Sequence, residues 1–141
     1  MITKKLNKAW TDIYYSLHYD YKEVLTHQNI RILQAISKND NVTIQFLSKM
    51  MDISHNTTSE HVQRLVKKGF IKKNKSPYDE RQVVVTLTEV GVRVLQQNTE
   101  LDEKKLGEVL NTLSIEDQQK IIWAFSLLGE AAKKRFDKEI Y

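Results

Sequence analysis

The stretch that decides the fold is residues 43–68, which read TIQFLSKMMDISHNTTSEHVQRLVKK. Thr43 is a good N-cap for a short helix, and Ser54 is a good N-cap for a longer helix running to about Lys68. Between the two helices, Asp52-Ile53-Ser54 makes a tight turn. The longer helix has an inward stripe at helical spacing, formed by Thr58, Val62, Leu65 and Val66. Two helices joined by a tight turn predict a helix-turn-helix.

A β-hairpin is expected directly after this pair of helices. Gly69 ends the longer helix, because glycine tolerates the positive φ that a C′ position requires. Strands are predicted at Phe70–Asn74 and at Gln82–Leu87, the second from its run of β-branched residues. The segment 75–81 between them is charged and holds the only proline of the chain. A helix-turn-helix followed by a hairpin predicts a winged helix-turn-helix.

Other helices are expected on both sides of this region, which makes six in all. Leu6, Ile13 and Leu17 mark a first helix, and Thr26 caps a second. Thr88 caps a fifth helix after the hairpin, and Ser114 caps a sixth that carries a wide apolar stripe. The fold class is therefore mainly α with a small β-hairpin wing.

The composition excludes several classes of protein. The chain has 141 residues, 40% of them hydrophobic, with 22 Lys and Arg against 18 Asp and Glu, a net charge of +4. It has no cysteine, which excludes disulfides, zinc-thiolate sites and thiol redox sensing. No apolar run approaches the roughly 20 residues of a membrane span, and the N-terminus is no signal sequence, so we expect a soluble, cytoplasmic protein. No nucleophile–base pair and no phosphate loop stand out, which argues against an enzyme.

The outer face of the longer helix carries hydrogen-bonding side chains. Recognition helices read bases mainly with their N-terminal residues, so the base-reading candidates are Asn56, Thr57, Ser59 and Glu60. His55 and Gln63 lie beside them, and His55 and His61 could touch phosphate when they are protonated. Two alternatives stay open. Any solvated helix face is polar, and Glu60 could instead form an ion pair with Arg64, four residues on.

Positive charge gathers on one segment of the chain. Between Arg64 and Arg81 lie seven cations and two anions, a local +5 that exceeds the net charge of the whole chain. This is the footprint expected for binding DNA phosphates or the minor groove. The candidates are Arg64, Lys67, Lys72, Lys73 and Arg81. Asp79 could hold the guanidinium of Arg81 in place; the alternative is a plain ion pair within a turn.

The predicted organisation follows from these elements. We expect one winged-helix protein over 1–141, with the DNA-binding winged helix-turn-helix at 26–88. The terminal helices, within 1–24 and 100–141, hold more apolar surface than a domain of this size can cover, which favours a homodimer. The alternative is that these helices pack on each other within one chain.

Two weaker signals concern small ligands. His18 and His27, with Asp20 and Glu23, could bind a metal, but their spacing fits no strong ligand motif, so we expect neither a metal nor a cofactor. Several aromatic residues of the N-terminal region could line a pocket for a small aromatic effector, although aromatics at helical spacing more often belong to a core or an interface. These residues are Trp10, Tyr14, Tyr15, Tyr19 and Tyr21.

Four segments in register resemble the MarR (multiple antibiotic resistance regulator) family. They are Leu25-Thr26, the recognition-helix exit from Leu65 to Lys73, Asp79-Glu80-Arg81 in the wing, and Leu87-Thr88-Glu89-Val90-Gly91 after it. The resemblance implies that Asp79 and Arg81 are wing residues and that Asn56, Thr57, Ser59 and Glu60 face the DNA groove. Two departures stand out. Position 80 is Glu where many members have a basic residue, and cysteine-based peroxide sensing is impossible without cysteine.

The resemblance also implies a function. Members of the family are homodimers joined by their terminal helices, bind pseudo-palindromic operators and usually repress, and many release DNA when a small molecule binds. The sequence therefore predicts a dimeric transcriptional repressor that binds double-stranded DNA. The alternative is a winged-helix module for protein interaction without its own operator, which the basic cluster between Arg64 and Arg81 disfavours.

Overall fold

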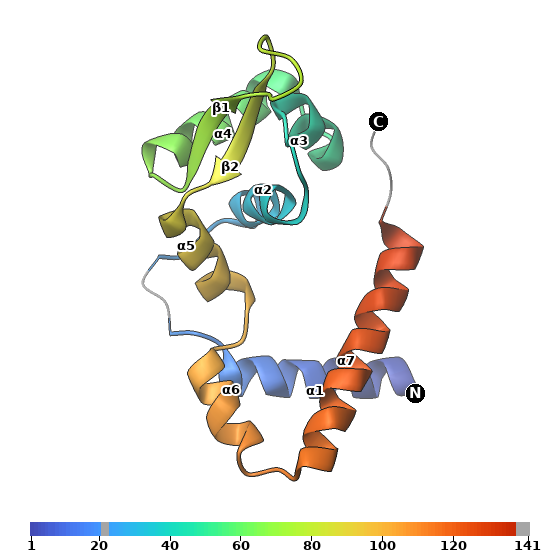
Figure 1. The fold of residues 1–141 in the computed structure, drawn as a ribbon. Coiled ribbons are helices and arrows are strands. Elements are labelled where there is room, and N and C mark those ends of the chain that lie inside the picture. Colours follow the sequence, from blue (N-terminus) through green and yellow to red (C-terminus); the bar gives the residue numbers. More distant parts are fainter. Residues whose placement is uncertain (21–22, 138–141) are drawn as a thin grey trace. The chain divides into compact units, whose positions relative to one another are not determined.

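The computed structural model describes residues 1–20 and 23–137 (Figure 1). Tyr21, one of the aromatic residues singled out above, lies outside them. The elements, in chain order, are α1 (Ile2–Leu17), α2 (His27–Lys38), α3 (Ile44–Met51), α4 (His55–Lys67), β1 (Ile71–Lys75), β2 (Val83–Leu87), α5 (Glu89–Thr99), α6 (Glu103–Leu110) and α7 (Ile115–Phe136). The predicted winged helix-turn-helix is confirmed, with α3 and α4 as the helix pair and β1 and β2 as the wing.

Side-chain capping explains where five of the helices begin. Each predicted cap accepts a hydrogen bond of 3.0–3.2 Å from the backbone N–H three residues further on. The five caps are Thr26, Thr43, Ser54, Thr88 and Ser114.

The sequence predicted six helices and omitted α6, which the described residues also form. Helix α5 ends at Thr99, because Glu100 adopts an extended backbone conformation. Two residues later Asp102 starts α6 by accepting hydrogen bonds from the backbone N–H groups of Lys104 and Lys105. Aspartate is a strong N-cap, and Asp102, shortly after the fifth helix, was the sequence signal for this second start.

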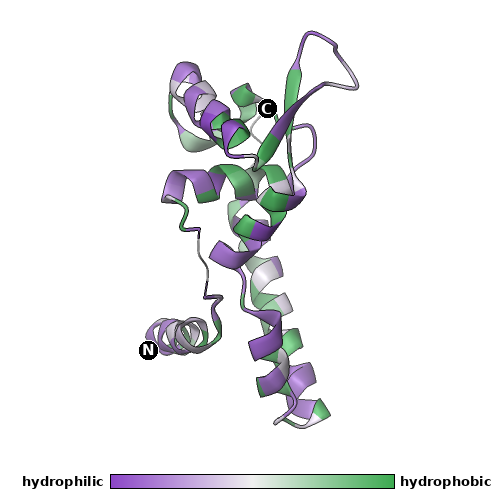
Figure 2. Ribbon diagram, turned by 90° about the vertical axis from the view of Figure 1, so that its left-hand side faces the viewer, coloured by the Kyte–Doolittle hydropathy of each residue, from purple (hydrophilic) through white to green (hydrophobic). Residues whose placement is uncertain are grey.

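The wing is a two-stranded antiparallel hairpin whose register pairs Ile71 with Leu87 and Lys75 with Val83. The loop before α3 extends this small sheet, because Val85 donates its N–H to the carbonyl of Val42 at 2.9 Å. Figure 2 shows the contrast between the hydrophobic β2 and the hydrophilic β1 and hairpin tip. The apolar strand therefore joins the core, and the cationic strand is left exposed.

The chain divides into two compact units. One spans Tyr19–Glu100 and holds α2 to α5, the hairpin and the hydrophobic core. Its fully buried side chains come from every one of these elements except α5; the largest are Ile32, Leu33, Leu47, Leu65 and Ile71. This core fixes α4 on α3 and on the wing.

The second unit comprises, among the described residues, 1–18 and 101–137, with α1, α6 and α7. None of these three helices has a buried residue. Backbone contacts join the end of α1 to the start of α6, since Asp102 donates its N–H to the carbonyl of Leu17 at 2.7 Å. In the part of the chain described, no helix combines the length and hydropathy that crossing a bilayer requires.

Candidate nucleic-acid interface

Burial sets which face of α4 is free. Thr58, Val62 and Leu65 are buried, as predicted, and Val66 is half-buried. The opposite face is open to solvent, and Ser59 on its flank is half-buried. The exposed side chains are His55, Asn56, Thr57, Glu60, Gln63, Arg64 and Lys67. One helix thus presents all the predicted base-reading residues on or beside one face.

Several hydrogen bonds hold the turn before α4. Asp52 has a φ of 54°, in the left-handed region, where Asp and Asn are the favoured non-glycine residues. The hydroxyl of Ser48 donates to the carbonyl of Ile53 at 3.1 Å, and the N–H of Ile53 donates to the carbonyl of Ser48 at 3.2 Å. At the start of α4, Ser54 caps the N–H of Thr57 and donates its own hydroxyl to the Thr57 Oγ1 at 2.9 Å. These bonds fix the angle at which α4 leaves α3.

Arg64 does not pair with Glu60, which corrects one of the two alternatives for Glu60. The Nη2 of Arg64 lies 2.9 Å from the Nδ1 of the half-buried His61, three residues before it. Within the described chain Glu60 forms no ion pair, and its carboxylate stays exposed. Spacing alone allowed both partners, since residues three and four apart are neighbours on a helix.

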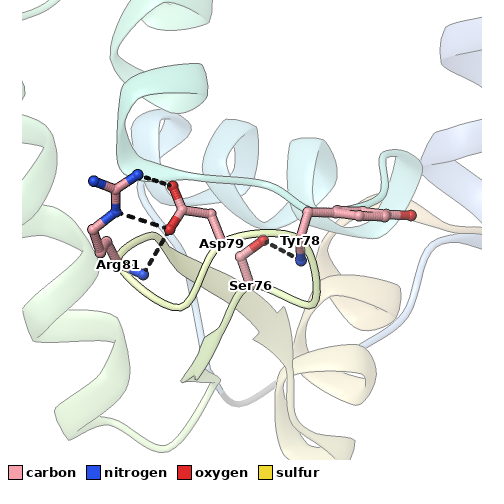
Figure 3. A network of polar contacts seen from close by, with 4 residues as sticks. All are labelled: Ser76, Tyr78, Asp79 and Arg81. Atoms are coloured by element: carbon pink, nitrogen blue, oxygen red, sulfur yellow. Dashed lines mark hydrogen bonds and ion pairs between the residues drawn. The ribbon is translucent and has the colours of Figure 1, made fainter.

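The hairpin tip holds Arg81 against Asp79 (Figure 3). The Asp79 carboxylate accepts from the backbone N–H of Arg81 at 3.0 Å, from its Nε at 3.2 Å and from its Nη2 at 3.4 Å. Ser76 braces the loop by accepting from the N–H of Tyr78 at 3.2 Å, and the Tyr78 ring points away from the ion pair. The side chain of Arg81 is still 91% exposed, so a fixed cation stands at the tip of the wing.

We expect the titration of Asp79 to report this contact. The side-chain hydrogen bond from Arg81, and then its backbone N–H, lower the pKa of Asp79 below its ordinary value. A lowered folded-state pKa means that the contact is intact above the unfolded-state pKa and is lost as the pH falls through the folded one. Carboxyl NMR should show this low midpoint, and Arg81→Ala should raise it part of the way back, because the backbone bond remains. Identical midpoints in the two proteins would show that the guanidinium does not contact Asp79.

The cations of β1 do not share one face. Lys72, Lys73 and Lys75 are all exposed, but successive side chains of a strand point to opposite faces. Lys72 is paired with Thr86 and Lys73 with the buried Val85, so the two lysines leave opposite sides of the hairpin. From the sequence, both lysines were placed in one group of phosphate-binding candidates. Because one stretch of DNA backbone meets only one face of the hairpin, only one of the two can contact it.

Sequence reasoning missed two contacts made by the segment before α2. The carboxylate of Glu23 lies 3.7 Å from the Nζ of Lys68, at the end of α4, and offsets one of the seven cations. The buried Asn98 of α5 accepts from the N–H of Leu25 at 3.2 Å and donates to the carbonyl of Glu23 at 3.0 Å. Both contacts join residues more than 40 positions apart, so no local sequence pattern predicts them.

The candidate ligand sites are less well defined. Among the described residues, no three His, Asp or Glu side chains gather closely enough to hold a metal ion. Of the predicted aromatic group, Trp10 lines an apolar cavity of about 470 Å³ with residues of α1 and α7, including Ile13, Trp123 and Leu128. Tyr15 is instead 83% exposed.

The family model described as "MarR family" matches residues 25–83. This is the segment from the start of the predicted second helix to the first residue of β2. It includes α3, α4 and the hairpin tip with Asp79 and Arg81.

Known proteins are similar over a longer part of the chain. The uncharacterised HTH-type transcriptional regulator YfiV of Bacillus subtilis (strain 168) is 29% identical over 102 residues, which is 72% of this chain and 64% of YfiV. This chain thus spans less than two thirds of that relative. The YvnA regulator of the same organism, also named as an uncharacterised HTH-type transcriptional regulator, is 28% identical over 79% of this chain and 74% of its own length.

Among solved structures, the transcriptional regulator Tm0710 of Thermotoga maritima has the same fold. Its TM-score is 0.59 at 24% identity, covering 81% of this chain and 80% of that one. The relatives and the solved structure named here are all transcriptional regulators by name, and none is named as an enzyme.

Proposed function

Because the chain carries a winged helix-turn-helix domain of the MarR family over residues 25–83, we propose that it is a transcriptional regulator that binds specific sequences of double-stranded DNA. Asn56, Thr57, Ser59 and Glu60 read base edges in the major groove. Arg64, Lys67 and Arg81, with either Lys72 or Lys73, bind phosphates or the minor groove. His55 and Gln63 border the reading face, and Asp79 orients Arg81. This assigns the DNA-binding function to 26–88.

The observation that carries the proposal is the pairing of a solvent-exposed polar helix face with a fixed wing cation. The guanidinium of Arg81 is oriented by two hydrogen bonds to Asp79, and its backbone N–H makes a third, yet the side chain is 91% exposed. An exposed arginine on a hairpin gains little stability from one ion pair. Its orientation is useful where a pre-ordered guanidinium meets a phosphate or a narrow minor groove.

We further propose that the protein acts as a homodimer through 1–24 and 100–141. Helix α7 exposes large apolar side chains along most of its length, among them Ile122, Trp123 and Leu128 at 66%, 66% and 61% exposure. Apolar hollows of about 470 and 530 Å³ border it, one shared with α1 and one with α6. Exposed apolar surface of this extent marks an interface, and two-fold pairing is its commonest form.

The protein acts in the cytoplasm, where it binds a pseudo-palindromic operator and represses transcription. A small aromatic effector that releases the DNA is part of the proposal. The apolar cavity beside Trp10 lies in the proposed dimer interface, and its lining offers such a molecule a place without charged groups.

The salt dependence of DNA binding tests the wing. Arg81→Ala removes one phosphate or groove contact, so affinity for every duplex should fall. The slope of log K against log salt should flatten by about 0.9 for the lost contact. Fluorescence anisotropy with a labelled duplex, at several salt concentrations, measures both effects.

Arg93→Ala is the matched control for this substitution. Arg93 is an exposed arginine of α5, which begins at the base of the hairpin and not at its tip. The control removes the same charge and should leave the slope close to that of the parent protein. Equal slopes for the parent and the Arg81→Ala protein would remove the wing from the interface.

A further inference from the structure

The outer face of α4 contains one arginine with two competing neighbours. Arg64 has Glu60 four residues before it and His61 three residues before it, and both side chains are within reach on a helix. A Glu–Arg pair of this spacing is the ordinary expectation. The structure instead has Arg64 Nη2 donating to His61 Nδ1 at 2.9 Å.

The chemistry of this contact fixes the state of the imidazole. A guanidinium has only N–H donors, so Nδ1 of His61 must be the acceptor. In this contact Nδ1 carries no proton, and the ring N–H is the one on Nε2. The ring is half-buried on the flank of α4, whereas Arg64 and Glu60 are exposed. The half-buried ring of His61 thus contacts the exposed guanidinium of Arg64.

The consequence for Glu60 follows from its position. Its carboxylate is exposed at the outermost part of the helix and forms no ion pair within the described chain. A free carboxylate accepts a hydrogen bond from the N4 amino group of cytosine in the major groove. An arginine bound to that carboxylate would occupy the same oxygens. Whether Glu60 reads a base therefore depends on where Arg64 is held.

We infer that His61 is a positioning residue for DNA specificity: it binds Arg64 and so keeps the Glu60 carboxylate free to read cytosine. The inference rests on the proposed function, since it presupposes that α4 enters the major groove. It adds His61, which contacts no base, to the residues that set the preferred sequence.

The test compares two substitutions of His61. His61→Asn keeps an acceptor, because the Oδ1 of asparagine takes the place of Nδ1, whereas His61→Leu has a similar size and no acceptor. Selection from a random duplex library first defines the operator, and Glu60→Gln identifies the base pair that Glu60 reads. Competition binding then measures the preference for cytosine at that pair.

We expect His61→Leu to reduce this preference about twofold. Without His61, Arg64 can pair with Glu60, and a Glu–Arg pair at this helical spacing is worth enough free energy for a change of about that size. His61→Asn should keep the preference of the parent protein. In an Arg64→Ala background the two substitutions should be equivalent, because the competitor for Glu60 is gone. An unchanged preference in His61→Leu, or the same loss in His61→Asn, would overturn the inference.

A second measurement needs no operator. Imidazole nitrogen NMR of the free protein should find Nδ1 of His61 unprotonated at neutral pH, with the proton on Nε2. Arg64→Ala should shift this tautomer equilibrium, and the control Arg93→Ala should not. A protonated Nδ1 in the parent protein would contradict the contact itself. If the library yields no operator while the NMR result holds, the proposed function fails, and the specificity role of His61 fails with it.

Discussion

Gly91→Ala should destabilise the protein by about 3 kcal/mol, because a side chain at this position has no space. A Cβ on Gly91 would overlap the carbonyl oxygen of Phe70 and lie 2.8 Å from its carbonyl carbon. That carbonyl already accepts the N–H of Thr88 at 3.0 Å, and the Thr88 hydroxyl donates to the carbonyl of Gly69. The added methyl group must push the first turn of α5 away from the start of β1 and weaken both bonds.

Thermal unfolding followed by circular dichroism measures this effect, which should appear as a fall in Tm of roughly 10 °C. Gly107→Ala in α6 is the matched control, since a Cβ there meets no atom within 4 Å. The control should be neutral or slightly stabilising, because alanine favours a helix by up to about 1 kcal/mol over glycine. A Tm for Gly91→Ala equal to that of the control would show that α5 does not pack closely on Phe70.

Leu128→Glu should separate the proposed dimer. Leu128 lies on α7 beside the apolar cavity lined also by Trp10 and Trp123, and its side chain is 61% exposed in the single chain. In a two-fold interface the new charge is buried twice. If each buried carboxylate costs about 2 kcal/mol of binding free energy, the two copies together lower the affinity of the dimer roughly 1000-fold. Affinity for a two-half-site operator should fall by at least about 100-fold, because each monomer then binds alone.

Ser126→Glu is the control for this charge. Ser126 is an exposed polar residue of α7 that lines neither apolar hollow. Sedimentation velocity should find this control dimeric and Leu128→Glu monomeric at micromolar concentration. A Leu128→Glu protein that remained a dimer with full operator affinity would place the interface elsewhere.

Local rules were enough to predict most of the DNA-binding unit. Ser54 and Thr43 begin their helices by capping the N–H three residues on, which depends only on nearby sequence. Gly69 ends α4 with a φ of 80°, where a Cβ is disfavoured by backbone conformation alone. The inward stripe of Val62 and Leu65 follows from helical spacing, and these side chains are buried.

What the sequence could not supply depends on distance in space. Three contacts join elements that are far apart in the chain. They are the close approach of Gly91 to Phe70, the ion pair of Glu23 with Lys68, and the hydrogen bond from Leu25 to Asn98. The partner of Arg64 was uncertain for a different reason. Two acceptors lie within reach on the same helix, and spacing rules do not rank a histidine at three residues against a glutamate at four.

The most direct test of the central claim is selection of binding sites from a random duplex DNA library by the purified protein at about 150 mM salt. The account predicts an enriched inverted repeat whose half-sites lie about one helical turn, roughly 34–36 Å, apart. Substitution of Asn56 by alanine should then relax the preference at one base pair, at a cost of about 1–3 kcal/mol. Bulk, salt-sensitive binding without any enriched sequence would contradict the account and favour a winged-helix module for protein interaction.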